Sequence, residues 1–140
     1  MNSLVTDPGR LRQIPLFAEF SDDALAHVVE LATEIEVPAG TVLALADDPG
    51  SGMFVVEEGR VAVEGHGGFQ SELGAGEFFG ELTLLVPDAH RVARVRALTD
   101  VRCLAIRRDD FTALLEEEPA LAVAMLPILA RRLADVMTPD

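Results

Sequence analysis

Two side chains of opposite charge, Glu81 and Arg91, stand ten positions apart in a glycine-rich part of the sequence. Arginine presents a planar, permanently charged guanidinium that suits two-point recognition of a phosphate. A carboxylate accepts hydrogen bonds from hydroxyl groups, such as those of a sugar. A ribose phosphate needs hydrogen-bond donors for its phosphate and a hydrogen-bond acceptor for its hydroxyl groups. These two residues are therefore the first candidates for a binding site.

The residues between them also favour an anion site. Gly80 permits a tight turn and a close approach of the backbone to a ligand. Residues 81–85, with the sequence ELTLL, are followed by Pro87 and can form one helical turn. The first turn of a helix leaves N–H groups unpaired and carries partial positive charge, which suits a phosphate.

The elements that must position this segment are mainly strands. Between Ile35 and Ile106, short apolar stretches alternate with glycine-rich breaks. Several short strands with turn signals between them indicate an all-β sandwich or barrel, and no strand–helix–strand alternation is present. The predicted strands include Val42, Leu43 and Leu45, then residues 53–56, 61–63 and 101–106.

The N-terminal part is predicted to be helical. Ser21 is a suitable N-cap, and the acidic residues Asp22 and Asp23 after it suit the positive end of a helix dipole. An apolar face with helical spacing follows at Leu25, Val28, Val29 and Ala32. Before the helix, a short packed turn is expected from Ile14, Leu16, Phe17 and Phe20.

The C-terminal part is predicted to hold two helices, over about residues 109–137. Asp109 or Asp110 can cap the first, and Pro119 can end it and begin the second. Pro127 lies inside the second helix and is expected to kink or split it. Its predicted buried face consists of Leu121, Met125, Ile128, Leu129, Leu133 and Val136.

The segment around Glu81 resembles the phosphate-binding cassette of cyclic-nucleotide-binding domains, as in catabolite activator proteins and protein kinase A regulatory subunits. There, a Phe-x-Gly-Glu-Leu segment leads through a short helix to an arginine, a small residue and alanine. The matching residues here are Phe78, Gly80, Glu81 and Leu82, then Arg91, Val92 and Ala93. The resemblance extends to the flanking segments, in the right order, from Ile14 to Met137.

This resemblance implies a mainly β fold with flanking helices. The expected architecture is an antiparallel β-roll, which is a double-stranded β-helix of jelly-roll type, with an N-terminal helix and C-terminal helices. The roll is expected over about residues 35–106. With a length of 140 residues, the chain is predicted to be one domain, residues 1–140.

The resemblance also implies roles for single residues. Arg91 would pair with the cyclic phosphate, and Glu81 would accept a hydrogen bond from the ribose 2′-hydroxyl. Backbone N–H groups of Glu81, Leu82 and Val92 would help to hold the phosphate. Gly80 would let the backbone close on the sugar. The predicted ligand-binding residues are Gly80, Glu81, Leu82, Arg91, Val92 and Ala93.

Val92 is a departure from part of the family. Bacterial activators often have Ser or Thr after the arginine, and this hydroxyl adds a phosphate contact. Kinase-type cassettes have Ala there and bind cyclic AMP through the backbone N–H, so Val92 is compatible with binding. The missing hydrogen bond to a charged group is worth about 1.5–3 kcal/mol. The absence of this hydroxyl favours cyclic AMP over cyclic GMP as the ligand, because recognition of cyclic GMP in the family often uses a Thr.

The net charge and the single cysteine indicate which partners the protein is not expected to bind and in which compartment it is expected. A net charge of −13 disfavours nucleic acid and anionic membrane surfaces as partners. No apolar run approaches the ~18 residues of a membrane span, and the opening MNSLVTDPGR is unlike a signal peptide. The single cysteine, Cys103, is interpreted as a core residue of a reduced, cytoplasmic protein, with a reactive thiol as the alternative.

Catalysis and metal binding are not expected. Cupin enzymes use barrels of similar size, but they cluster histidines around a metal. Here His27, His66 and His90 are dispersed, and no His-x-His pair exists. The sequence also offers no nucleophile–base pair. We therefore expect no enzyme activity, no metal and no cofactor, with a cyclic nucleotide as the regulatory ligand.

The leading hypothesis is a cyclic-nucleotide sensor domain. Ligand binding would move the C-terminal helices, and the output would pass through a partner protein or a homodimer. Arg131 and Arg132 are interpreted as complementing the helix dipole, with a purine contact as the alternative. The rival hypothesis is a degenerate cassette in a ligand-free protein-interaction or dimerisation module, which Val92 and the acidic field favour.

Overall fold

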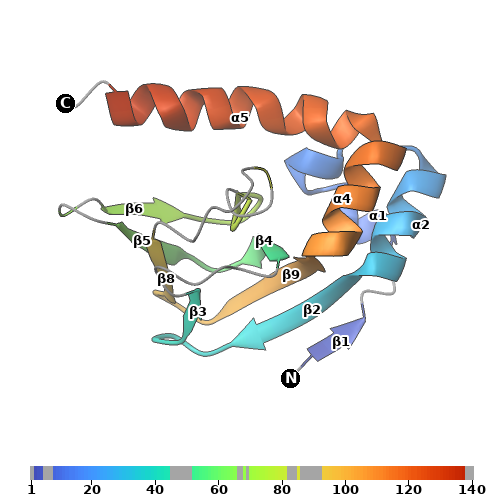
Figure 1. Ribbon diagram of the computed structural model, residues 1–140. Helices are drawn as coiled ribbons and strands as arrows, with labels where there is room; N and C mark the ends of the chain where they lie inside the picture. The colour runs from blue at the N-terminus through green and yellow to red at the C-terminus, as the bar shows by residue number, and fades with distance from the viewer. Residues whose placement is uncertain are drawn as a thin grey trace.

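Two antiparallel sheets and flanking helices make up the computed structural model, which describes residues 2–4, 8–44, 52–65, 68, 70–81, 85 and 93–137. The first sheet has the order β1-β2-β9-β4-β7, and the second has the order β3-β8-β5-β6. The predicted β-roll with helices at both ends is therefore confirmed (Figure 1). The division into one domain stays a prediction.

The strands of the first sheet are β1 (Asn2–Leu4), β2 (Ala32–Val37), β9 (Val101–Arg107), β4 (Gly52–Glu58) and β7 (Phe78–Phe79). Those of the second sheet are β3 (Val42–Ala44), β8 (Ala93–Ala97), β5 (Val61–Gly65) and β6 (Gln70–Leu73). The helices are α1 (Pro8–Leu11), the 3-10 turn η1 (Pro15–Phe17), α2 (Asp22–Leu31), α4 (Arg108–Glu117) and α5 (Pro119–Met137).

Strand β9 organises the first sheet because it pairs with β2 on one side and with β4 on the other. Its last residues, Ile106 and Arg107, lie opposite Met53 and Gly52 of β4. The chain then enters α4 directly, so the C-terminal helices start at the end of the sheet where α2 also leads into β2. Helices α2 and α4 therefore lie at the same end of the roll (Figure 1).

Alternation along β4 divides the apolar residues between two cores. Met53 and Val55 belong to a core shared with the helices, whereas Val56 belongs to the core between the two sheets. The second core also includes Cys103, which is fully buried, and burial raises the pKa of its thiol to about 12. The interpretation of Cys103 as a core residue is confirmed.

The N-terminal expectations are confirmed in part. Ala32 was predicted on the helix face but is the first residue of β2, because it pairs with Ile106 of β9. Ser21 caps α2, since its hydroxyl oxygen accepts a hydrogen bond from the Ala24 N–H at 3.1 Å. The predicted packed turn is η1 and its neighbours, with Leu16 and Phe17 buried. Strand β1, which pairs with β2, was not expected from the sequence.

The predicted cap of the first C-terminal helix is wrong. Helix α4 has Arg107 as its N-cap, with no side-chain capping bond, and Asp109 and Asp110 lie in its first turn. Strand β9 keeps its pairing through Arg107, so the chain becomes helical immediately after the last ladder position. The two carboxylates still lie where the helix dipole favours negative charge.

Pro127 was expected to kink or split helix α5, and of these two outcomes the split is wrong. Pro127 does not split it: the helix runs unbroken through the proline. The proline removes the hydrogen bond to the carbonyl of Val123, and both residues are exposed, so water can satisfy that carbonyl. None of the helices in the described part of the chain combines the length and the apolarity that crossing a membrane requires.

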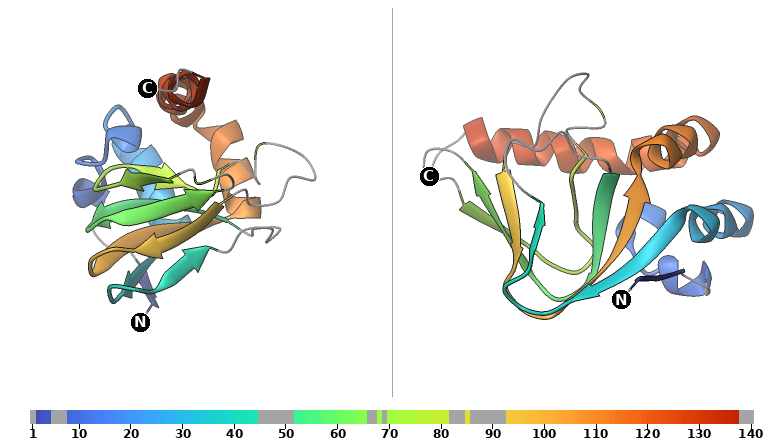
Figure 2. Two further views of the ribbon diagram at one scale, coloured as in Figure 1. Left: turned by 90° about the vertical axis from the view of Figure 1, so that its left-hand side faces the viewer. Right: turned by 60° about the horizontal axis from the view of Figure 1, so that its bottom comes forward.

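The predicted buried face of α5 is only half correct. Leu121 and Met125 are buried in the helix-side core, and Ile128 and Leu129 pack partly against it. Leu133 and Val136 were predicted to be buried but are each 61% exposed. The reason is that the C-terminal half of α5 extends beyond this core and passes across the open side of the roll (Figures 1 and 2).

We predict that Gly59→Ala destabilises the protein more than Gly40→Ala does. Both glycines have left-handed backbone, with φ of +95° and +92°. A Cβ at Gly59 would lie 2.3 Å from the Asp100 carbonyl oxygen, whereas a Cβ at Gly40 meets no atom within 4 Å. Urea unfolding should show a loss of about 1 kcal/mol for Gly40→Ala and about 2–4 kcal/mol for Gly59→Ala. Equal losses would contradict the close approach at the β4–β5 turn.

Candidate functional site

The residues predicted to hold the sugar follow the short strand β7. This strand pairs with β4, with Phe78 opposite Val55 and Phe79 opposite Phe54. Gly80 then adopts a left-handed backbone, with φ of +94°. A glycine is the residue that takes this conformation without strain, and the turn leads directly into Glu81.

Glu81 is only 6% exposed, although it carries a carboxylate. Its carbonyl oxygen accepts a hydrogen bond from the Leu85 N–H at 2.9 Å. This bond has the i to i+4 spacing of an α-helical turn, and residues 82–84 between the two lie outside the described residues. The acceptor predicted for a sugar hydroxyl therefore lies in a water-poor position next to the predicted anion-binding turn.

The other predicted site residues fall into two groups. Ala93 begins β8 in the second sheet, opposite Gly65 of β5. It shares the face of β8 that carries Val95 and Ala97, which are buried in the core between the sheets. Leu82, Arg91 and Val92 lie outside the described residues, so their predicted contacts stay predictions.

A further residue, Arg132 of α5, contacts this segment in three ways. Its Nη2 donates a hydrogen bond to the carbonyl oxygen of Phe78 at 2.6 Å. Its guanidinium carbon lies 4.4 Å from the centre of the Phe78 ring, in a cation–π contact. Its Nη1 lies 3.5 Å from Oε2 of Glu81. Helix α5 thus supplies a counter-charge for the buried carboxylate.

Sequence reasoning assigned Arg132 to the helix dipole and missed these contacts. The signal that identifies it is helical periodicity. Starting from the buried Leu121 and Met125, the face of α5 continues through Ile128 to position 132. Arg132 is half-buried, whereas the neighbouring Arg131 falls on another face and is exposed. A cation that continues an apolar helix face is a candidate partner for a buried anion.

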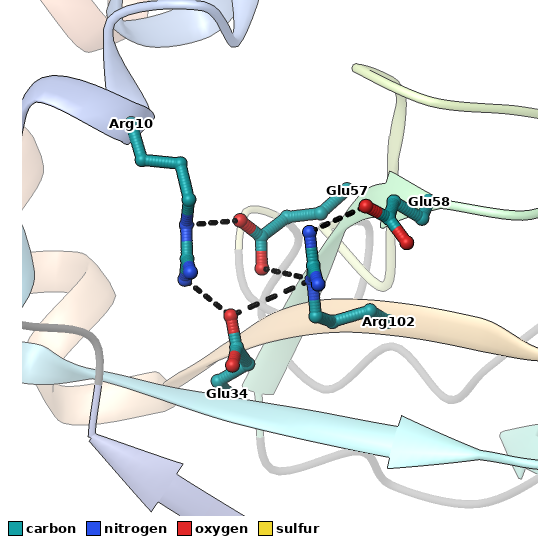
Figure 3. Close-up of polar contacts among 5 residues, drawn as sticks. All are labelled: Arg10, Glu34, Glu57, Glu58 and Arg102. Atoms are coloured by element: carbon teal, nitrogen blue, oxygen red, sulfur yellow. Dashed lines mark hydrogen bonds and ion pairs between the residues drawn. The ribbon is translucent and has the colours of Figure 1, made fainter. Parts of the chain in front are cut away.

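A second group of charges lies on the helix side of the first sheet (Figure 3). It consists of Arg10 from α1, Glu34 from β2, Glu57 and Glu58 from β4, and Arg102 from β9, and we call it the sheet ion cluster. On the same face, two residues further along each strand, stand the core residues Ala32, Val55 and Leu104. The cluster therefore begins where the helix-side core ends.

One carboxyl group of the sheet ion cluster is buried without a complete set of hydrogen bonds. Glu57 has a side chain only 5% exposed, between Arg10 Nε at 3.2 Å and Arg102 Nε at 3.7 Å. Its Oε1 makes no hydrogen bond to any described residue. Burial, and then the adjacent Glu34 carboxyl, raise the pKa of Glu57 to about 7 against the opposing effect of both arginines.

The part of the chain that contains the end of β7 matches a known protein family. The model of the cyclic nucleotide-binding domain family matches residues 34–118, which include the whole segment from Phe78 to Ala93. This chain belongs to the cyclic nucleotide-binding domain family. The two sheets are thus the family's β-roll, and the assignment of the cassette to the segment after β7 stays a prediction.

Relatives and solved structures place the domain in several kinds of protein. An uncharacterized NTE family protein of Mycobacterium tuberculosis is 36% identical over 88% of this chain and 21% of its own length. A cyclic nucleotide-gated potassium channel of Rhizobium etli is 38% identical over 78% of this chain and 30% of its own. The chain therefore spans less than a third of either relative.

Among solved structures, the catabolite activator protein of Thermus thermophilus is similar, with a TM-score of 0.75 and 31% identity. The match covers 87% of this chain and 59% of that one.

As for metals, no three His, Cys, Asp or Glu side chains gather within the described ranges in a way that could hold an ion. His27 lies instead 3.3 Å from Glu117, which joins α2 to α4 when the imidazole is protonated.

We predict that Glu57 makes the protein less stable as the pH rises. A pKa raised from 4.5 to about 7 means that the folded protein holds this proton more tightly than the unfolded chain does. The free energy of unfolding should therefore fall as the pH rises from 4.5 to about 7. In urea unfolding between about pH 5 and about pH 8, wild type should lose more stability than Glu57→Gln.

Glu64→Gln is the matched control. Hydrogen bonds from Arg96 and Arg94 lower the pKa of Glu64, so its contribution is lost only as the pH falls below the ordinary range of a carboxyl. Its stability curve should run parallel to that of wild type in the same window. Parallel curves for wild type and Glu57→Gln would show that the sheet ion cluster does not hold Glu57 in its protonated form.

Proposed function

We propose that this domain binds a cyclic nucleotide, cyclic AMP in preference to cyclic GMP, and acts as a regulatory domain rather than an enzyme. The observation that carries the proposal is the buried carboxylate of Glu81, held in the family's cassette at the end of β7 and covered by Arg132 of α5. A charged acceptor is costly to bury, and a ligand hydroxyl there would gain a strong hydrogen bond.

In the proposed complex, Glu81 accepts a hydrogen bond from the ribose 2′-hydroxyl, and Arg91 pairs with the cyclic phosphate. Backbone N–H groups of Glu81, Leu82 and Val92 complete the phosphate contacts. Gly80 allows the backbone to approach the sugar. Ala93 starts β8 on the inner face of the second sheet, and its small side chain leaves room beside the ligand.

The proposed output is a change in α5. This helix packs on the helix-side core through Leu121 and Met125, and it reaches the cassette through Arg132. A ligand that contacts Glu81 would therefore change the balance of positions open to α5. The ligand can shift α5 from one position to another only as far as it binds the domain more tightly in one of them.

The proposed partner is a second copy of this chain, in the cytoplasm. The exposed residues Val123, Leu126, Ala130, Leu133 and Met137 recur along α5 at alternating spacings of three and four. This is the apolar repeat of two helices that pack along a common seam. A stripe that repeats in this way fits the same stripe on a second α5, which is why we prefer a homodimer to an unrelated protein.

One observation favours the second candidate function, a ligand-free interaction module. In this structure, the proposed ribose acceptor already has a protein partner, Arg132. If that contact is permanent, the domain works through α5 alone. A melting curve separates the two functions, since cyclic AMP at about 100 times its dissociation constant should raise the melting temperature by several degrees. An unchanged melting temperature would favour the module.

We predict that Arg91→Ala weakens cyclic AMP binding by about tenfold to hundredfold, because charge-assisted phosphate contacts are lost. Isothermal titration calorimetry measures the dissociation constant, with cyclic GMP titrated in parallel. Arg94→Ala is the control, since Arg94 pairs with Glu64 in an exposed position. No heat at high micromolar cyclic AMP, or equal affinity in wild type and Arg91→Ala, would contradict the proposed site. Equal affinity for cyclic GMP would contradict the preference.

We predict that Leu133→Lys converts a dimer into a monomer in sedimentation velocity. The substitution places a charge in the apolar stripe, where its burial is costly. It also makes the net charge of −13 less negative, so increased self-repulsion cannot explain dissociation. Val42→Lys adds the same charge at an exposed apolar position of β3 and should stay dimeric. A monomeric wild type, or a dimeric Leu133→Lys, would contradict the proposed partner.

A further inference from the structure

Arg132 connects three groups at the start of the cassette to one helix. The hydrogen bond to the Phe78 carbonyl, at 2.6 Å, is the firm contact. The ion pair with Glu81, at 3.5 Å between Nη1 and Oε2, is the longer one. The two contacts use different nitrogens of the same guanidinium. Arg132 can therefore give up Glu81 and still hold Phe78.

We propose that Arg132 competes with the ligand for Glu81, so that α5 inhibits its own binding site. This inference rests on the proposed function, because it takes Glu81 as the acceptor for the ribose hydroxyl. A cyclic nucleotide must then exchange the ion pair for its own hydrogen bond. The exchange reduces the net gain from the ribose contact and weakens the hold of α5 on the cassette, with the hydrogen bond from Arg132 to Phe78 remaining.

Because the ion pair between Arg132 and Glu81 is partly buried, breaking it should measurably weaken ligand binding. The side chains of Arg132 and Glu81 are 28% and 8% exposed, so water screens their attraction less than it screens a surface pair. Other residues near the end of α5, including Leu133 and Val136, are mostly exposed and so pack little against the roll. Among the described residues, Arg132 therefore makes a main contact between the C-terminal half of α5 and the roll.

The test compares Arg132→Gln with Arg131→Gln, an adjacent and exposed arginine that loses the same charge. Calorimetric titration with cyclic AMP should give about fivefold tighter binding for Arg132→Gln, the scale of one lost ion pair. Arg131→Gln should bind as wild type does. With 2′-deoxy cyclic AMP, which lacks the hydroxyl, the gain for Arg132→Gln should disappear. Arg132→Lys, which keeps the charge but not the fork of donors, should fall between the two.

A second readout needs no ligand. Hydrogen exchange of the backbone amides in residues 130–137 should be faster in Arg132→Gln than in wild type or Arg131→Gln. Equal exchange in all three would overturn the competition, and so would weaker or unchanged cyclic AMP binding by Arg132→Gln when wild type binds. Failure of every variant to bind cyclic AMP would instead overturn the proposed function, and the competition with it.

Discussion

A carboxylate buried at the end of a two-residue strand is the constraint on which the functional part of this structure depends. Glu81 is 6% exposed, and a charge in that position needs a counter-charge or strong donors. The described counter-charge comes from Arg132, 51 residues further along the chain. The cassette and the last helix are therefore linked by electrostatics as well as by chain connectivity.

The rest of the fold makes this link possible. Strand β9 lies between β2 and β4, so the chain leaves the sheet at the end where the N-terminal helices already lie. Helices α4 and α5 then share a core with α2 and η1 through residues such as Phe111 and Leu121. From that fixed start, α5 extends across the open side of the roll (Figure 1). Its Arg132 guanidinium lies over the Phe78 ring.

The sequence allowed strands β4, β5 and β9 and the Ser21 cap to be predicted, because each depends on residues close together in the chain. The cassette was assigned from an equally short motif. Alternation, a capping side chain and a short motif are local signals. The role of Arg132 and the sheet ion cluster were missed because their partners are far apart in sequence. Arg10 and Glu57 meet only after α1 is packed on the first sheet (Figure 3).

The errors at the C-terminal helices have the same origin. The continued pairing of β9 set the start of α4, which overrode the preference of Asp109 or Asp110 for the cap position. The apolar pattern of α5 correctly indicated an amphipathic helix, but it could not show where the roll stops covering it. The ligand-binding roles of all six predicted residues rest on the motif and stay predictions, and Leu82, Arg91 and Val92 also lie outside the described residues.

The central claim is that a cyclic nucleotide binds in the cassette beside Glu81 and under α5. Its most direct test is an amide NMR titration of the ¹⁵N-labelled chain with cyclic AMP. The claim predicts that the signals of Gly80, Glu81 and Ala93 shift together with the side-chain Nε–H of Arg132, while those of α2 stay in place. Absence of shifts at saturating ligand, or shifts confined to residues away from the cassette, would contradict it.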